Sequence, residues 1–266
     1  MVEKAMPFHE KDALRYYTFE SLDDEGILQA AFTRHGGVSP APWAKLNLGS
    51  LVGDDLEHVS ENRRRVFQSI GRPIESLFDV WQVHGTSVVC AESPRPLSAP
   101  HQKADVILTD NPGVTILMRF ADCVPILYYD PIHRVVGLAH AGWQGTVRLV
   151  AEAAVKAMHN VYGSRPEDIL TAIGPSIDMH HYEVGEDVIL KVQDTFGSDA
   201  SSLLPVHDGA VKFDLWAANQ LVLEKSGVRN IELTNLCTAC HTTDWFSHRG
   251  EKGITGRFGV VISLRS

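Results

Sequence analysis

Three separated segments of the sequence place a metal ligand or a nucleophile beside small or turn-forming residues. They read WQVHG at 81–85, ADCVP at 121–125 and LAHAGWQGT at 138–146. His84, Cys123 and His140 from these segments would form a three-ligand zinc site whose fourth position stays open to water, as in catalytic zinc sites. Spacing alone leaves two alternatives open: both histidines could be structural, and Cys123 could be a buried, unreactive thiol.

A fourth segment, CTACH at 237–241, has the spacing that attaches a c-type haem through two thioethers and an axial histidine. The N-terminal segment carries charges throughout and lacks the apolar run of a secretory signal, so we expect a cytoplasmic protein without haem. The four cysteines are too few for a disulfide scaffold and are expected to stay as thiols. A zinc site built from Cys237, Cys240 and His248 remains an alternative, although no second C-x-x-C pair completes it.

The composition is that of an ordinary globular domain. The chain has 266 residues, of which 44% are hydrophobic and 21% are charged. A net charge of −9 argues against the broad basic face that binds a phosphate backbone. No run of uncharged apolar residues is long enough for a membrane-spanning helix. We therefore expect neither nucleic acid nor a membrane as a partner.

Hydrophobic periodicity predicts how these segments are held. Short apolar runs bounded by turn residues predict strands at 27–33, 114–120, 124–129, 134–140, 169–174 and 260–264. Apolar residues at three- and four-residue spacing predict helices at 56–70, 146–162, 186–196 and 214–226, each followed by a glycine. Adjacent strands without intervening helices around 114–140 favour an α+β layered fold over strict βαβ alternation.

A set of short motifs distributed over residues 33–257 resembles one known family. The motifs are TRHGGVS (33–39), NLG (47–49), QVHG (82–85), ADCVPIL (121–127), AHAGWQGT (139–146), IGPSI (173–177), YEVG (182–185), and CT, DWFSHRG and TGR between 237 and 257. Together they are similar to the multicopper polyphenol oxidase, or laccase-domain, family, which comprises purine nucleoside phosphorylases with adenosine deaminase activity. The resemblance covers nearly the whole chain in one order.

This resemblance implies a fold and a metal site. It implies one domain over residues 1–266 with an N-terminal extension at 1–24, folded as a layered α-β-β-α sandwich with mixed sheets, like the toxin-deamidase cysteine hydrolases. It also implies that His84, Cys123 and His140 are the metal ligands, with zinc as the ion and copper as the alternative. Because those hydrolases use a Cys/His pair, Cys123 and His140 could also act as nucleophile and base.

Further residues are expected to bind and turn over substrate. The residues expected on the substrate-binding wall are Arg34, His35, Asn47, Cys237 and Arg249, with Arg257 as a further cation. Asp122, next to Cys123, is the expected proton shuttle, and Asp105 is the other candidate. Gln144 stands where the family usually has arginine, so a neutral amide replaces a guanidinium fork suited to phosphate.

The expected reactions are phosphorolysis of adenosine, inosine and methylthioadenosine, and hydrolytic deamination of adenosine. The sequence has no His-x-His pair of the kind that true multicopper oxidases use, so phenol oxidation would be incidental copper chemistry. It also lacks the His-x-Glu and Pro-Cys-x-x-Cys motifs of cytidine-type deaminases. A Cys/His hydrolase, an enzyme that edits cell-wall precursors and a non-catalytic zinc-binding module stay open as alternatives.

Overall fold

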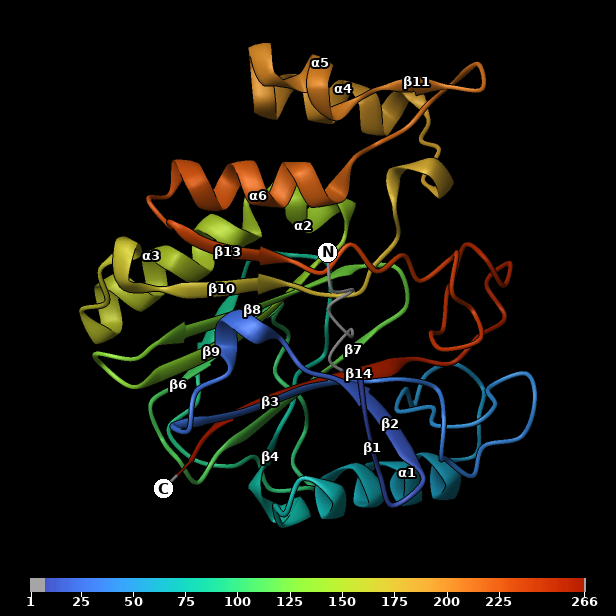
Figure 1. The fold of residues 1–266 in the computed structure, drawn as a ribbon, viewed down its shortest axis with the longest axis vertical. Helices are drawn as coiled ribbons and strands as arrows, with labels where there is room; N and C mark the ends of the chain where they lie inside the picture. The colour runs from blue at the N-terminus through green and yellow to red at the C-terminus, as the bar shows by residue number, and fades with distance from the viewer. Residues whose placement is uncertain (1–7, 266) are drawn as a thin grey trace, which may run out of the picture.

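Two mixed sheets lie face to face between layers of helices in the computed structural model, which describes residues 8–265 (Figure 1). The first sheet has the strand order β1 (Phe8–Lys11), β2 (Leu14–Tyr17), β3 (Ile27–Phe32), β14 (Phe258–Leu264), β7 (Thr115–Phe120), β4 (Leu77–Phe78). The second has the order β13 (Asn230–Leu233), β10 (Leu170–Ile173), β8 (Val124–Asp130), β9 (Val135–Ala141), β6 (Val106–Thr109), β5 (Val88–Cys90). A short ribbon pairs β11 (Val206–His207) with β12 (Ala210–Val211). The prediction of a layered fold with mixed sheets is confirmed.

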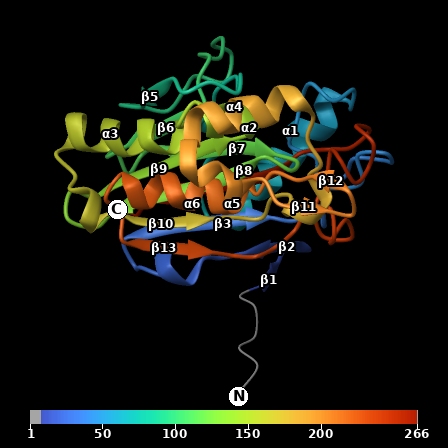
Figure 2. The same ribbon diagram turned by 90° about the horizontal axis from the view of Figure 1, so that it is seen from above.

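Helices cover the outer face of each sheet. Helix α1 (Leu56–Ser69) lies against the first sheet, at the bottom of Figure 1. The second sheet is covered by α2 (Trp143–Val147), α3 (Val150–Tyr162), α4 (Glu186–Phe196), α5 (Ala200–Leu203) and α6 (Leu215–Lys225), which Figure 2 shows from above. Three of the four predicted helices are confirmed. The predicted helix at 146–162 is instead two helices, because Leu149 adopts a left-handed conformation (φ +63°) that ends one helix and precedes the next.

Alternation along β8 shows how the layers are joined. Ile126 and Tyr128 face the helices over the second sheet, whereas Leu127 and Tyr129 face the first sheet. A third apolar cluster lies between the first sheet and α1, where Phe32 packs with side chains of that helix. Full burial of each such side chain contributes about 1.5–3 kcal/mol, so the three interfaces hold the layers in fixed positions.

The strands that the periodicity did not predict are short or lie near the ends of the chain. Strand β4 has two residues and β5 has three, which is too short for an alternating pattern to be read. Residues 8–17 of the expected N-terminal extension form β1 and β2, which add to the edge of the first sheet. Residues 1–7 of that extension lie outside the described residues.

Strand register brings the chemically interesting residues to one end of the second sheet. In the β8–β9 pair, Pro125 lies opposite His140, so Cys123 lies just beyond the paired end of β8. On the other side of β9, the His140 N–H donates to the Asp105 carbonyl oxygen at 2.8 Å. The loop between β4 and β5 carries His84 to the same place. Within the described residues, no helix combines the length and apolar character needed to cross a bilayer.

Candidate metal centre and active site

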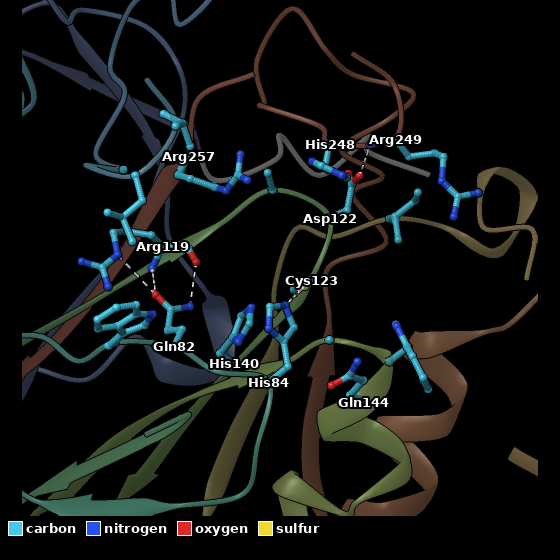
Figure 3. Close-up of a pocket in the computed structure, with 18 of the residues that line it drawn as sticks. Gln82, His84, Arg119, Asp122, Cys123, His140, Gln144, His248, Arg249 and Arg257 are labelled. Carbon is cyan, nitrogen blue, oxygen red and sulfur yellow. Dashed lines mark hydrogen bonds between the residues drawn. The ribbon is translucent and has the colours of Figure 1, made fainter. Parts of the chain in front are cut away.

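The structure brings His84, Cys123 and His140 together. One side-chain donor atom from each of them lies within 4.8 Å of the other two. The distance from His84 Nε2 to Cys123 Sγ is 3.9 Å, and the two imidazole rings meet edge to face with centroids 4.8 Å apart. Figure 3 shows the three side chains converging from a loop, a strand end and a strand. Two imidazoles and one thiol in this arrangement could hold a metal ion.

Asp105 orients this cluster from behind. Its Oδ1 atom lies 2.8 Å from His140 Nδ1, so the other ring nitrogen of His140 is left to face Cys123 and His84. The same carboxylate accepts the backbone N–H groups of Val83, His84 and Gly85 at 3.2, 2.9 and 2.7 Å. A carboxylate behind a histidine ligand fixes its tautomer and ring orientation in metal sites. Asp105 therefore positions two of the three donor residues rather than facing the cavity.

Gly142 leaves the space in which the donor atoms meet. A Cβ atom at this position would lie 2.9 Å from Cys123 Sγ and 2.9 Å from His84 Cδ2, closer than side chains approach. The backbone of Gly142 has a negative φ that any residue adopts, so the need for glycine here is space and not conformation. The donor set, the carboxylate behind His140 and this space all fit a bound metal ion.

The electrostatics of the cluster favour ionised side chains. Burial opposes ionisation of Cys123, but the neighbouring His140 and His84 outweigh it and lower the pKa of the thiol to about 6. Burial likewise opposes protonation of His140, but Cys123 and Asp105 outweigh it and raise the pKa of the imidazole to about 9. The cluster thus holds a thiolate near neutral pH, which is the form that binds metal or attacks an electrophile.

Hydrogen bonds from neighbouring segments fix the carboxylate of Asp122. It has a left-handed backbone (φ +83°), and its Oδ1 atom accepts hydrogen bonds from the Thr238 and Ser247 hydroxyls, both at 2.7 Å. Its Oδ2 atom accepts the Arg249 N–H at 2.6 Å. Asp122 borders the cavity, but these three bonds use its carboxylate to fix the segments at 237–238 and 247–249 beside the cluster.

A cavity of about 710 Å³ opens above the cluster. Its cationic side chains come from three separate segments: Arg119 from β7, Arg249 from the loop after β13, and Arg257 just before β14. The wall also contains Gln82 and Gln144, the latter at the start of α2 (Figure 3). A cavity of this size with converging polar groups suits a small organic ligand, and guanidinium groups suit an anionic one.

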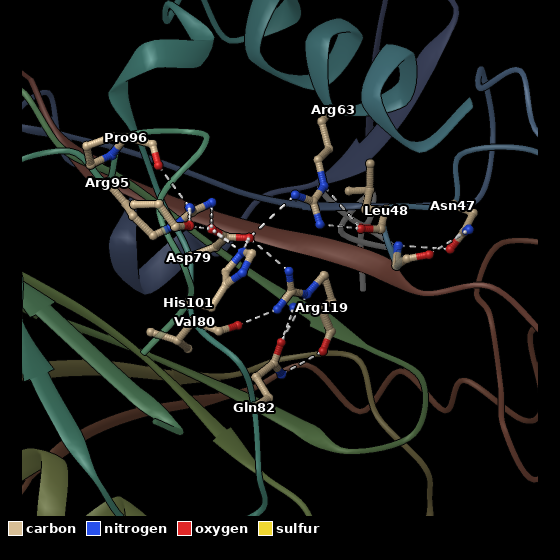
Figure 4. Close-up of polar contacts among 12 residues, drawn as sticks. Asn47, Leu48, Arg63, Asp79, Val80, Gln82, Arg95, Pro96, His101 and Arg119 are labelled. Atoms are coloured by element: carbon tan, nitrogen blue, oxygen red, sulfur yellow. Dashed lines mark hydrogen bonds and ion pairs between the residues drawn. The ribbon is translucent and has the colours of Figure 1, made fainter. Parts of the chain in front are cut away.

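Arg119 and its environment were not predicted from the sequence. Its guanidinium donates to Asp79 Oδ2 at 2.9 Å, and its backbone N–H donates to Gln82 Oε1 at 3.0 Å. Asp79 also pairs with Arg63 and Arg95, so one buried carboxylate serves three guanidinium groups (Figure 4). The available signal was an arginine within the largely apolar strand TILMRF, because a cation in such a buried strand requires a partner.

Several residues expected on the substrate-binding wall lie elsewhere. Arg34 pairs with Glu251 at 2.9 Å and donates to the Ala44 carbonyl oxygen, and His35 contacts Asp244 at 3.1 Å. Asn47 is fully buried, where it fixes a turn through Gly49. None of these three is among the residues that line the cavity, and neither is the buried Cys237. Their polar groups are already used to join loops, so Arg249 and Arg257 are the expected residues that do reach the wall.

Comparison with known proteins agrees with this site and fold. Residues 28–265 match the family model described as multi-copper polyphenol oxidoreductase laccase. The chain is 38% identical over 238 residues to a purine nucleoside phosphorylase of Deinococcus radiodurans, covering 90% of this chain and 89% of that one. It is 33% identical over 245 residues to purine nucleoside phosphorylase YfiH of Escherichia coli, covering 90% and 95%.

Solved structures give the same result. The crystal structure of YlmD from Geobacillus stearothermophilus matches with a TM-score of 0.90 at 32% identity, covering 98% of this chain and 99% of that one. The crystal structure of the hypothetical protein YfiH from Bacillus licheniformis matches with a TM-score of 0.89 at 30% identity, covering 97% and 99%. With its full-length matches in sequence and in fold, the chain belongs to the multi-copper polyphenol oxidoreductase laccase family, whose relatives named above include purine nucleoside phosphorylases.

Proposed function

We propose that this protein is a zinc-dependent purine nucleoside phosphorylase that cleaves adenosine, inosine and methylthioadenosine, and that it also deaminates adenosine. The observation that carries the proposal is the His84–Cys123–His140 cluster at the base of a cavity with arginines on its wall. The names of the relatives support the reaction class. A cytoplasmic location is part of the proposal, because the reducing cytosol keeps free cysteines of the kind found here as thiols.

The two imidazoles and the thiolate would hold the ion. Zinc at such a site acts as a Lewis acid and lowers the pKa of water toward neutrality, which suits deamination of adenosine at C6. The chain's own residues set the geometry: Asp105 orients His140 and the loop that carries His84, and Asp122 fixes the loop that carries Arg249. Copper is the alternative ion, because imidazole and thiolate also bind it.

Phosphorolysis places different demands on the cavity. An oxygen of inorganic phosphate forms a bond to C1′ of the ribose while the C1′–N9 bond breaks, and the electron pair leaves with the purine. Positioning and charge stabilisation dominate such a step. We assign phosphate binding to the guanidinium groups of Arg249 and Arg257, which line the cavity on either side of Asp122 in Figure 3. Gln144 offers a neutral amide on the opposite side of the cluster (Figure 3).

A second candidate function rests on one further observation. Cys123, His140 and Asp105 form a chain in which the thiol faces an imidazole whose Nδ1 atom contacts a carboxylate at 2.8 Å. This is the arrangement of a cysteine hydrolase, in which the thiolate attacks a carbonyl and the imidazolium returns the proton to the leaving group. It agrees with the expected likeness to the toxin-deamidase cysteine hydrolases. Such an enzyme would work without metal and without phosphate.

The test is a product analysis of adenosine incubated with purified protein, with and without phosphate. The proposal predicts adenine and ribose 1-phosphate only when phosphate is present. Inosine should accumulate without phosphate, and in its presence part of the inosine should be converted to hypoxanthine. Removing the metal with a chelator should abolish both products, and added zinc should restore them. Cys123→Ser should be inactive, while Cys90→Ser, which changes a thiol of β5 outside the cavity, should keep full activity. Full activity of metal-free protein would exclude a metal-dependent mechanism, and the absence of all products would refute the proposed phosphorylase and deaminase activities and leave the hydrolase candidate.

A further inference from the structure

A second cluster of soft metal ligands lies outside the cavity wall. His181, Cys237 and Cys240 each place a donor atom within 4.8 Å of the other two, and they share no residue with the first cluster. The distance from His181 Nε2 to Cys240 Sγ is 3.1 Å. The sequence suggested His248 as the third ligand of the two cysteines, but the structure places His248 on the cavity wall and His181 beside the thiols.

Backbone hydrogen bonds hold both arms of this cluster. His181 ends the short 3₁₀ helix η4 (Met179–His181), and its N–H donates to the Asp178 carbonyl oxygen at 3.1 Å. The His241 N–H donates to the Cys237 carbonyl oxygen at 3.1 Å, which closes a turn with both cysteines on it. The Thr238 N–H bonds the Ser176 carbonyl oxygen at 3.0 Å and so joins the two arms. The three donors are therefore preorganised by local structure.

Two backbone N–H groups donate to the sulfur of Cys237. Its buried sulfur accepts the Asp178 N–H at 3.3 Å and the Cys240 N–H at 3.4 Å. Both amides are therefore directed at one sulfur atom. A donation from the N–H of the second cysteine in C-x-x-C to the sulfur of the first is an outer-sphere contact that orients a metal-bound thiolate. These two bonds point to a ligand independently of the clustering itself.

The donor set also selects the ion. Two thiolates and one imidazole favour Zn²⁺ or Cu(I) and disfavour Mg²⁺ and Ca²⁺, which require oxygen donors. Tetrahedral zinc, with bonds of about 2.3 Å to sulfur and about 2.0 Å to nitrogen, sets its donors roughly 3.5–3.8 Å apart. The donors here lie within 4.8 Å, so small side-chain rotations suffice. His181 and Cys240 are exposed, which gives an ion access from solvent and leaves a fourth position for water.

We propose that His181, Cys237 and Cys240 bind a second Zn²⁺ ion that is separate from the ion at the cavity and does not depend on the proposed function. The site has a direct connection to the cavity. Thr238, between the two cysteines, donates its hydroxyl to Asp122, and the Ile177 N–H donates to the Asp122 carbonyl oxygen at 3.0 Å. Tyr182, next to His181, lines the cavity. A bound ion thus ties together two segments that form one wall of the active site.

The test is zinc stoichiometry and affinity, measured on the full chain by elemental analysis and by competition with a chromophoric chelator. The wild type should bind two equivalents of Zn²⁺, and Cys123→Ser should bind one, at the second site. Cys240→Ser and His181→Ala should each lower the affinity of the second site for zinc by more than about 100-fold, because losing a ligand lowers affinity more than losing an outer-sphere partner does. His180→Ala is the matched control: its ring packs against His207 and lies outside the cluster, so both ions should stay.

Cobalt substitution identifies the ligands in a way that activity does not. In Cys123→Ser, Co²⁺ at the second site should give thiolate-to-metal absorption from two sulfurs, and this absorption should fall by about half when Cys240→Ser is added. The absence of bound zinc in Cys123→Ser, or the same zinc content in Cys240→Ser as in the wild type, would overturn the proposal. A Cys237–Cys240 disulfide in freshly purified protein that binds no second ion after reduction would also overturn it, in favour of a redox pair.

Discussion

Replacing Asp105 by asparagine separates the positioning of the metal ligands from the ligands themselves. The Asp105 carboxylate accepts four hydrogen bonds, from His140 Nδ1 and from the backbone N–H groups of residues 83–85. The asparagine amide keeps one oxygen, so two of these four donors would face an NH₂ group. Hydrogen bonds to a charged group contribute about 1.5–3 kcal/mol each, so Asp105→Asn should lower the free energy of unfolding by about 3–6 kcal/mol.

The same change should weaken metal binding, because His140 and His84 lose their fixed orientation. Loss of an outer-sphere carboxylate typically lowers metal affinity about 10–100-fold, which corresponds to about 1.4–2.7 kcal/mol. Urea unfolding of the metal-free protein gives the first quantity. Competition with a chromophoric zinc chelator gives the second, measured in the Cys240→Ser background so that only the cavity site is read.

Asp130→Asn is the matched control. Asp130 is also a buried aspartate that accepts two backbone N–H groups and contacts a histidine nitrogen, His133 Nδ1, at 2.8 Å, but it lies at the opposite end of β8 from Cys123. The Asp130→Asn protein should have a lower free energy of unfolding, while its zinc affinity should stay within about twofold of the wild type, since distant sites act independently. A folded Asp105→Asn protein with unchanged zinc affinity would refute the positioning role of Asp105.

Three further predictions follow from the cavity and its surroundings. Gly142→Ala should weaken zinc binding at the cavity, measured by chelator competition, whereas Gly85→Ala should not, because a Cβ there meets nothing closer than 3.5 Å. Asp79→Asn should cost about 3–5 kcal/mol in urea unfolding at pH 7, because the buried Arg95 and the partly buried Arg63 and Arg119 lose their shared carboxylate. Burial raises the pKa of Asp79, but the arginines outweigh it and lower that pKa below 3.8, so its stabilisation is complete above pH 4 and the deficit should shrink as the pH falls further. Gln144→Arg should leave the KM for phosphate within about twofold, because phosphate is assigned to Arg249 and Arg257 on the other side of the cluster, and a tenfold lower KM would show that phosphate binds beside α2.

The fold could be predicted in its long elements and not in its short ones. Strand β8 and helix α1 have enough residues for their periodicity to be read, and both are found where the pattern places them. The break at Leu149 could not be predicted, because a left-handed leucine is set by the packing of two helices and not by its own preference. The pairing order of the sheets also depends on contacts between residues far apart in sequence.

The residues of the site were likewise predictable only in part. His84, Cys123 and His140 carry a recognisable chemistry in recognisable local sequences, and the structure brings them together. Arg34 and Asn47 lie in equally distinctive motifs, yet their polar groups join loops rather than facing the cavity. Local sequence shows that a polar residue is constrained, but it does not show whether a ligand or the protein itself satisfies that residue. Arg119 is the converse case, a residue of the cavity wall with no motif around it.

A zinc titration of metal-free Cys240→Ser protein, with phosphorolysis of inosine measured at each step, shows whether the reaction depends on an ion at the cavity. This variant keeps the cavity cluster and lacks one ligand of the second cluster. If His84, Cys123 and His140 hold the ion on which the reaction depends, release of hypoxanthine should rise in proportion to added zinc and level off at one equivalent. Phosphorolysis at full rate before any zinc is added, or no phosphorolysis after saturation, would show that the reaction does not depend on zinc held by this cluster.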